Sequence, residues 1–214
     1  MKNQQKIALA GATGKIGKPL LNSLLQQGYQ VKALIRKPES FLFSHPSLEI
    51  VQGDLVSLES TELFLRDCNA VISTIGQVKD EPMVSAVATS NIVKTMLNYG
   101  IQRYLLLAGL NLDVPGDSKS TANRESSAWM RQTFPEVVAD KQKAYDILSR
   151  NEVDWTLFRL PWIVETDERA GIIADLQDCP GKQVYSHELA DFMIGQLNNP
   201  LFIKKAPFVA SKTE

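Results

Sequence analysis

Cysteine and histidine are scarce in this sequence. Cys68 and Cys179 are its two cysteines, and His45 and His187 are its two histidines. So few cysteines exclude a disulfide-stabilised miniprotein and favour two reduced thiols in a cytoplasmic protein. Because neither histidine belongs to a group with the spacing of metal ligands, we expect no metal site.

Long apolar runs and blocks of one charge are also lacking. No run approaches the roughly 20 apolar residues of a transmembrane helix, and the run at residues 7–10 is too short for a signal peptide. Lys and Arg number 23 and Asp and Glu number 24, so the net charge is −1. This balance gives no electrostatic reason to expect nucleic acid or a membrane as partner. We therefore expect a cytoplasmic monomer or small homo-oligomer whose partner is a small molecule.

Length and composition indicate one globular domain. The chain has 214 residues, of which 44% are hydrophobic and 22% are charged. This balance suffices for a substantial core and excludes a disordered or collagen-like chain. We treat residues 1–214 as a single domain.

Short apolar runs alternate with segments of helical periodicity. The runs predict strands at residues 7–10, 30–36, 48–52, 70–75, 103–108 and 155–160. The periodic segments predict helices over residues 15–27, 58–66, 83–99 and 136–150, with another from about residue 186 and a final apolar run at 207–210. This order predicts a Rossmann-type α/β fold, a doubly wound parallel sheet with helices on both faces. Residues 164–214, less regular and too few for a separate domain, are expected to form a small cap on the substrate side.

A glycine-rich motif follows the first predicted strand. It reads Gly11-Ala12-Thr13-Gly14-Lys15-Ile16-Gly17. Gly11 permits a tight turn, Gly14 lets the backbone approach a diphosphate, and Gly17 lets the following helix pack closely on the strand. Because the free N–H groups at a helix start attract anions, the motif predicts a dinucleotide site.

The second predicted strand ends in two cations, Arg36 and Lys37. An acidic residue there would favour NAD by accepting a hydrogen bond from the ribose 2′-hydroxyl. A cationic pair suits a 2′-phosphate instead, and Lys15 could add a second positive charge. These residues predict NADP(H) as cofactor, while the alternative makes Arg36 a solvated strand end.

Four segments together resemble atypical short-chain dehydrogenases. They are GATGKIG at 11–17, ALIRKP at 33–38, Gly53-Asp54-Leu55, and AVISTIG at 70–76. The resemblance is to the NmrA-like and the flavin-reductase or biliverdin-reductase-B-like NAD(P)H-binding proteins, and it extends over about residues 7–163.

The resemblance implies a cofactor role for residues at the ends of several strands. The expected contacts are Gly11, Thr13, Gly14, Lys15, Ile16 and Gly17 with the diphosphate side, Arg36 and Lys37 with the 2′-phosphate, Asp54 and Leu55 with the adenine, and Thr74, Ile75 and Gly76 with the adenosine end and the bridging ribose. For Asp54, an Asx turn is the alternative.

The sequence departs from the family at the catalytic positions. Typical members use a Tyr, a Lys four residues later on a helix, and a Ser at the end of the fifth strand. Here Ser149 follows four residues after Tyr145, and Ala108 and Gly109 stand where the Ser is expected. A Tyr–Lys mechanism is therefore not expected, and this also counts against a sugar epimerase.

The remaining catalytic candidate is Lys141, on the helix before the sixth strand. It could contact the nicotinamide ribose or donate a proton, and the alternative is a solvated lysine such as Lys143. Further cofactor contacts are expected from Ala108, Pro161 and Ile163, and substrate contacts from Gly109, Asn111, Tyr145 and Trp162. Trp162 could stack on a planar substrate or be an ordinary packing residue.

Two functions fit these residues. The first is an NADPH-dependent reductase of a planar or conjugated molecule such as a flavin or quinone, in which the cofactor supplies hydride and the protein orients it. The second is a non-catalytic NADP(H)-binding regulator of the NmrA type.

Overall fold

A computed structural model describes residues 5–78 and 80–212 of the chain. Its centre is an eight-stranded sheet with the strand order β3-β2-β1-β4-β5-β6-β10-β8. The edge strand β8 runs antiparallel to β10, and the other neighbours are parallel. The strands are β1 (Lys6–Ala10), β2 (Gln30–Ile35), β3 (Leu48–Gln52), β4 (Ala70–Ser73), β5 (Arg103–Gly109), β6 (Asp154–Leu160), β8 (Ile172–Asp175) and β10 (Phe208–Ser211).

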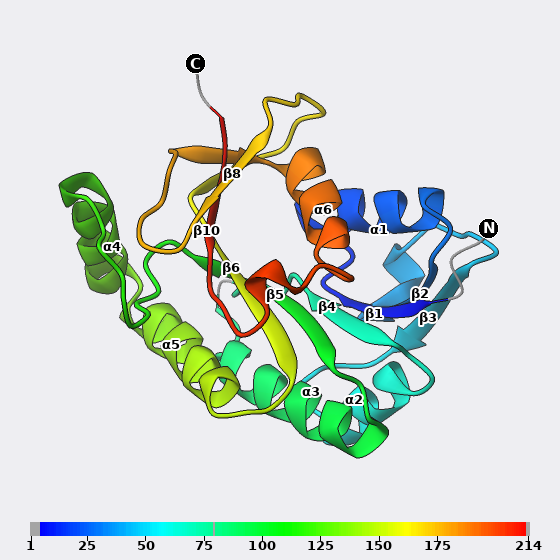
Figure 1. Cartoon of the computed structure of the whole chain (residues 1–214). Coiled ribbons are helices and arrows are strands. Elements are labelled where there is room, and N and C mark those ends of the chain that lie inside the picture. The colour runs from blue at the N-terminus through cyan, green and yellow to red at the C-terminus, as the bar shows by residue number, and fades with distance from the viewer. Residues whose placement is uncertain (1–4, 79, 213–214) are drawn as a thin grey trace.

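Helices cover both faces of this sheet (Figure 1). One face carries α1 (Gly17–Gln26) and α6 (Ser186–Gly195), and the other carries α2 (Leu58–Leu65), α3 (Ser85–Tyr99) and α5 (Pro135–Ser149). The predicted doubly wound Rossmann-type fold is thus confirmed, and with it a switch point between β1 and β4, where ligands of such folds bind.

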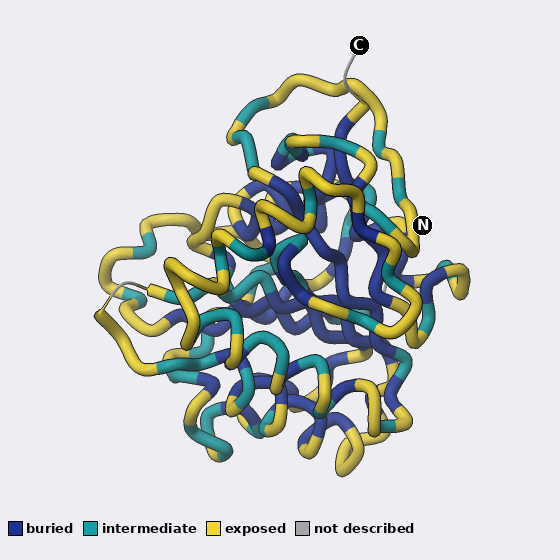
Figure 2. The backbone as a smooth tube through the Cα atoms, turned by 90° about the vertical axis from the view of Figure 1, so that its left-hand side faces the viewer, coloured by how far each residue is buried: buried dark blue, intermediate teal, exposed yellow. Residues whose placement is uncertain are grey.

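The core consists of two layers, one on each side of the sheet. In β1, Ile7 and Leu9 face the layer under α1, whereas Ala8 and Ala10 face the layer under α3. All four side chains are buried, which explains why this strand has an uninterrupted apolar sequence. In Figure 2 the central strands are dark blue and the outer helices are largely yellow and teal.

The C-terminal segment differs from the expected cap. Strands β10 and β8 extend the main sheet, and Leu189, Met193 and Val209 belong to the main core. Strands β7 (Trp162–Val164) and β9 (Gln183–Tyr185) form a separate two-stranded parallel sheet. Within residues 164–214, β8, β10 and α6 therefore belong to the main sheet and its covering layer.

Several elements were not predicted from the sequence. Helix α4 (Thr121–Thr133) lies beside α5 at the periphery of the molecule, and Ser127 is its one buried residue (Figure 1). This helix is mostly polar, so that no apolar run marks it in the sequence. The short strands β7, β8 and β9 and the 3-10 turns Pro38–Ser40 and Pro200–Phe202 also carried no clear signal. None of the helices in residues 5–78 and 80–212 has the length and apolarity needed to cross a membrane.

Candidate functional site

The glycine motif forms a tight turn between β1 and α1. Gly11 has a φ of +83°, a backbone conformation that favours glycine, and its carbonyl accepts a hydrogen bond of 3.0 Å from the Gly14 N–H. A Cβ atom on Gly17 would lie 1.9 Å from the Gly11 carbonyl oxygen. The close approach of helix and strand that the sequence predicted for Gly17 is therefore present.

The turn leaves room for an anion at the start of α1. Thr13, Gly14 and Lys15 are exposed at its tip, whereas Ile16 and Gly17 are buried. Ile16 is the N-cap residue of α1, and among the described residues no side chain caps its first amides at this position. Backbone amides without an internal partner at a helix start bind phosphate groups. The turn thus fits a diphosphate, whereas the Ile16 side chain packs in the core.

Thr74 connects the end of β4 to the same turn. Its hydroxyl donates to the carbonyl oxygens of Ala10 and Gly11, at 3.2 Å each, and its N–H donates to Ala10. Ile75 is half-buried and Gly76 is exposed. The residues expected at the bridging ribose therefore lie beside the glycine turn.

The residues expected at the adenosine end have other partners as well. Arg36 Nη1 donates to Glu81 Oε2 at 2.5 Å, while Lys37 is exposed. Asp54 Oδ1 accepts from the Val56 N–H at 3.1 Å, which is the Asx turn of the alternative interpretation. Leu55 is buried, so that a contact to an adenine would come from its backbone.

Lys141 reaches the carboxyl edge of the sheet from α5. Its Nζ donates to the carbonyl oxygens of Ile75, at 3.2 Å, and Leu107, at 3.4 Å. Burial lowers the pKa of Lys141 to about 8, although the charge of Asp140 opposes this shift. Lys143, two residues later, is exposed. The solvated-lysine alternative thus describes Lys143 and not Lys141.

Asp140 holds this part of α5 in place. Its carboxylate accepts from the backbone N–H groups of Ser85, at 2.7 Å, and Ala86, at 3.2 Å, and so caps the first turn of α3. The neighbouring residues Asp140 and Lys141 therefore bind both ends of the segment between β4 and α3. The sequence indicated Lys141 but gave no sign of the capping role of Asp140, because the capped helix begins 55 residues earlier.

Residues after β5 and β6 show mixed exposure. Ala108 and Pro161 are buried, and Gly109 and Ile163 are partly buried. Asn111 is buried, and a Cβ on Gly109 would lie 2.4 Å from its Oδ1. Its side chain is therefore folded against Gly109, while Trp162 is 75% exposed. Of the expected substrate contacts, Trp162 is the one most open to a ligand.

Tyr145 is partly buried on α5. Its ring packs edge-on against Trp155, with 6.0 Å between the ring centroids. Trp155 is the second residue of β6, far from the carboxyl end of that strand. Tyr145 also lies within electrostatic range of Arg159, near the carboxyl end of β6, and of Asp117. Its expected substrate contact therefore stays a prediction.

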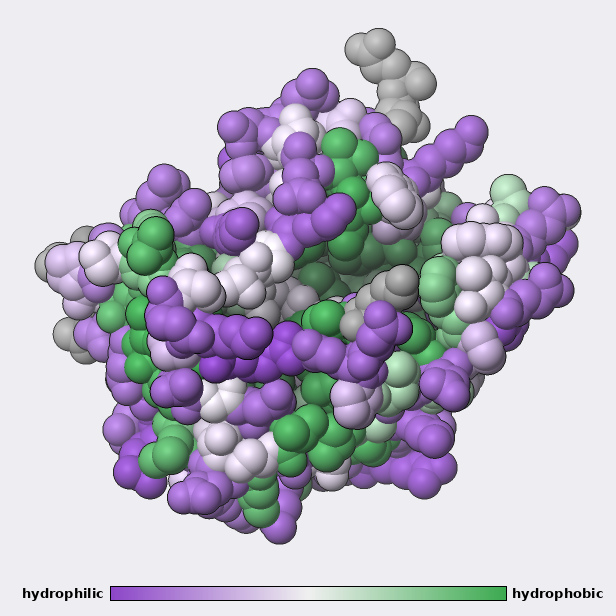
Figure 3. All heavy atoms as spheres, turned by 180° about the vertical axis from the view of Figure 1, so that it is seen from behind, coloured by the Kyte–Doolittle hydropathy of each residue, from purple (hydrophilic) through white to green (hydrophobic). Residues whose placement is uncertain are grey.

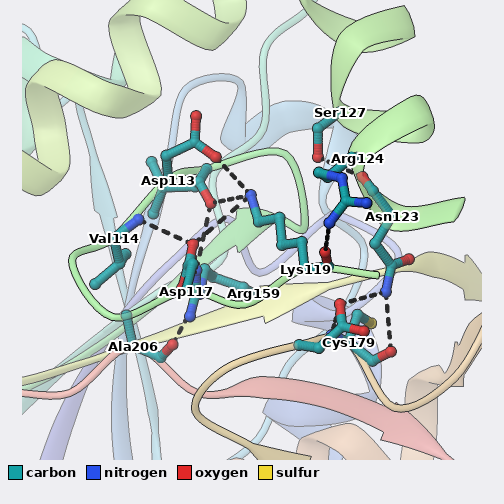
Figure 4. Close-up of polar contacts among 12 residues, drawn as sticks. Asp113, Val114, Asp117, Lys119, Asn123, Arg124, Ser127, Arg159, Cys179 and Ala206 are labelled. Carbon is teal, nitrogen blue, oxygen red and sulfur yellow. Dashed lines mark hydrogen bonds and ion pairs between the residues drawn. The ribbon is translucent and has the colours of Figure 1, made fainter. Parts of the chain in front are cut away.

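A buried ion pair anchors the segment after β5 and was missed by sequence reasoning. Arg159 is fully buried in β6, and its Nη1 donates to both carboxylate oxygens of Asp117 at 2.7 Å (Figure 4). Its other donors bind the carbonyls of Ala206 and Leu176. An arginine inside the apolar run WTLFRL at 155–160 was the signal, because a buried guanidinium requires partners.

Lys119 extends this anchor. Its buried Nζ donates to the Leu112 carbonyl at 2.8 Å and to Asp113 at 2.7 Å, and Figure 4 shows it beside Asp117. Asp113 also pairs with Arg131 of α4 at 2.9 Å. The segment at 110–120 is thus held at several points.

Two cavities adjoin these residues. One of about 10 Å³ lies beneath Lys141, among Ser73, Tyr104 and Thr89, and another of about 430 Å³ lies between Thr13, Lys18 and residues 40–43. On the face opposite to that of Figure 1, hydrophobic side chains line a hollow near the centre (Figure 3). The described residues contain no group of three or more metal-ligating side chains.

Curated relatives match parts of longer proteins. The chain is 26% identical to cinnamoyl-CoA reductase 2 of Medicago truncatula over 175 residues, covering 70% of this chain and 51% of that protein. It is 25% identical to protein TIC 62, chloroplastic, of Arabidopsis thaliana over 245 residues, covering 99% of this chain and 37% of that protein. The chain thus spans about half or less of the length of these two relatives.

Solved structures share the fold over nearly the whole chain. A short-chain dehydrogenase/reductase from Veillonella parvula in complex with NADP has a TM-score of 0.81 at 18% identity, covering 98% of this chain and 95% of that one. ChuY, an anaerobillin reductase from Escherichia coli O157:H7, has a TM-score of 0.81 at 18% identity, covering 98% of each chain. At this identity the likeness shows the fold.

The family model described as NAD(P)H-binding matches residues 11–200. This span begins at the first glycine of the motif and includes every strand-end residue described above. The expected membership among NAD(P)H-binding proteins is confirmed. The chain belongs to the NAD(P)H-binding family.

Proposed function

We propose that the protein is an NADPH-dependent reductase of a small planar or conjugated acceptor such as a flavin or quinone. The observation that carries this proposal is the position of Lys141, whose ammonium group binds Ile75 and Leu107 at the ends of β4 and β5. The glycine turn that fits a diphosphate lies at the same edge. A partly buried lysine beside a turn that fits a cofactor is a candidate for contact with the bound ligand.

The proposed cofactor contacts follow the strand ends. The exposed residues Thr13, Gly14 and Lys15 would contact the diphosphate, although the Gly14 N–H already donates to the Gly11 carbonyl. Arg36, with Lys37 nearby, would bind the 2′-phosphate. Asp54 and Leu55 would flank the adenine, and residues 74–76 would line the bridging ribose. Ala108, Pro161 and Ile163 would contact the nicotinamide end through their backbone.

The proposed reaction needs little acid–base catalysis by the protein. NADPH would supply the hydride. Ala108 and Gly109 bring no hydroxyl group to the end of β5. Lys141 would hold a proton at Nζ, and a reduced flavin or quinone anion can take its proton from Lys141 or from water. An acceptor of this kind therefore suits a site without a Tyr–Lys pair.

Two further observations support a planar substrate. Trp162 follows the end of β6 and is 75% exposed, so that its ring could form one wall for a flat ligand. ChuY, which shares the fold, is described as an anaerobillin reductase, and the structure from Veillonella parvula holds NADP.

The test is NADPH oxidation by the purified protein with a panel of flavins, quinones and aldehydes. We expect turnover above the free-cofactor background with flavins or quinones, and none with aldehydes. Tight NADPH binding without turnover of any acceptor would contradict the reductase and indicate the regulator.

Lys141→Met tests the role of the ammonium group, with Lys143→Met as a control that removes the same charge from an exposed position. We expect Lys141→Met to lower turnover about 10–100-fold with little change in NADPH affinity. Lys143→Met should behave as the unmodified protein. Equal turnover in both variants would show that Lys141 takes no part in the reaction.

A further inference from the structure

A carboxylate already binds the guanidinium that is proposed for the 2′-phosphate. Arg36 Nη1 and Glu81 Oε2 lie 2.5 Å apart, and both side chains are about half exposed. Hydrogen bonding to Glu81 raises the pKa of Arg36, and the nearby Asp54 adds to this effect. Glu81 is not in the turn after β2 but in the segment between β4 and α3. The sequence gave no reason to connect the two residues.

The ion pair crosses the cofactor edge of the sheet. β1 lies between β2 and β4, and the glycine turn begins where β1 ends. A link from the segment after β4 to the end of β2 therefore passes the start of this turn. A dinucleotide that extends from the glycine turn to Arg36 meets Glu81 at its phosphorylated ribose.

The segment that carries Glu81 is held in place by side chains. Gln77 Nε2 donates to the carbonyl oxygens of Glu81, at 2.7 Å, Val78, at 2.9 Å, and Pro82, at 3.2 Å. Asp140 binds the amides of Ser85 and Ala86 just beyond it. The position of Glu81 opposite Arg36 is thus supported by contacts on both sides.

A phosphate group can displace Glu81 at this site. An exposed ion pair is weak, and a phosphate carries more charge and more acceptor oxygens than a carboxylate. A carboxylate that stays near a bound phosphate repels it. Both effects act on NADP(H) and neither acts on NAD(H), which lacks the 2′-phosphate.

We propose that Glu81 is a specificity-determining residue that competes with the 2′-phosphate for Arg36 and so limits the preference for NADP(H) over NAD(H). The proposal rests on the proposed cofactor function. Glu81 acts by occupying Arg36 in the free protein, and binding of NADP(H) requires the pair to open. Removal of the Glu81 charge then strengthens NADP(H) binding. If Glu81 instead helped to hold Arg36 in its binding position, its removal would weaken NADP(H) binding.

The test is calorimetric titration of NADPH and NADH into the unmodified protein, Glu81→Gln and Asp80→Asn. Asp80 is the adjacent carboxyl residue, so that Asp80→Asn removes the same charge from the same segment. We expect Glu81→Gln to tighten NADPH binding about 3–10-fold and to leave NADH within about twofold. Asp80→Asn should change both affinities less than about twofold.

Arg36→Ala provides the background that isolates the pair. In that background Glu81→Gln should no longer tighten NADPH binding, because the shared partner is gone. Three results would overturn the proposal but not the proposed cofactor site. They are a gain that persists without Arg36, an equal gain in Asp80→Asn, and an NADPH affinity of Glu81→Gln that is unchanged or weaker. Absence of binding by either coenzyme overturns the proposed function together with it.

Discussion

The two halves of the candidate site are built by different means. On the cofactor side, backbone hydrogen bonds and one hydroxyl join the ends of β1 and β4, as in the contacts of Thr74 with Ala10 and Gly11. On the substrate side, buried ion pairs hold the segment after β5, and Arg159 and Asp117 are 42 residues apart. Backbone turns follow local sequence, whereas such pairs depend on the completed fold. The backbone turn of the cofactor side can therefore be read from a motif, whereas side-chain pairs between distant elements cannot.

The largest expected effect comes from breaking the buried ion pair. Asp117→Asn leaves the fully buried Arg159 without its charge partner, which should lower the free energy of unfolding by about 3–5 kcal/mol. Urea unfolding measures this loss. The control is Glu152→Gln, because Glu152 is 88% exposed and pairs with the exposed Lys204, so that its removal should change the free energy of unfolding far less. Equal losses in the two variants would contradict the role of the buried pair as an anchor.

A smaller effect on stability but a large one on binding is expected at Gly17. A Cβ there would meet backbone atoms of Gly11 and Ala12, which cannot move without reshaping the turn. Gly17→Ala should destabilise the protein by about 1–3 kcal/mol and weaken NADPH binding about 100-fold. Thermal unfolding and fluorescence titration measure the two effects.

Gly14→Ala is the matched control for the glycine turn. Its added Cβ would lie 3.3 Å from the Gly11 carbonyl, so that the fold should tolerate it better. Cofactor binding should still weaken, because the methyl group is exposed where the diphosphate is proposed. Unchanged NADPH affinity in both variants would make the motif a structural turn alone.

The sequence predicted the sheet and its cofactor edge because these features are local. Gly11, Gly14 and Gly17 are close together in one motif, and β1 and β4 are continuous apolar runs. Helix α4 was missed because its side chains are mostly polar and exposed. Glu81, Asp140 and Asp117 were missed because each binds a partner from another element. Their roles could be recognised only once the fold was known.

Arg36→Ala sharpens the comparison on the cofactor side. Loss of the guanidinium should weaken NADPH binding by about 1–3 kcal/mol, the range for hydrogen bonds to charged groups, while NADH binding changes little. Competitive displacement of a fluorescent nucleotide measures both affinities. Equal losses for the two coenzymes would remove the 2′-phosphate role from Arg36.

The smallest expected effect is the pH dependence of turnover. Lys141 has a pKa of about 8, so its ammonium group loses its proton as the pH rises through that value. If Lys141 donates a proton, kcat/KM should be level below pH 8 and fall above it. The Lys141→Met variant should lack this alkaline limb, whereas Lys143→Met should retain it. The same limb in all three proteins would assign the titration to another group.

The central claim is that the turn after β1 binds the diphosphate of a nicotinamide coenzyme while Arg36 selects the extra phosphate. Calorimetric titration of the unmodified protein with NADPH and NADH tests it most directly. The account predicts binding of NADPH at least about tenfold tighter than binding of NADH, a difference of about 1.4 kcal/mol. Equal affinities would contradict the role of Arg36, and no heat with either coenzyme would contradict the whole account.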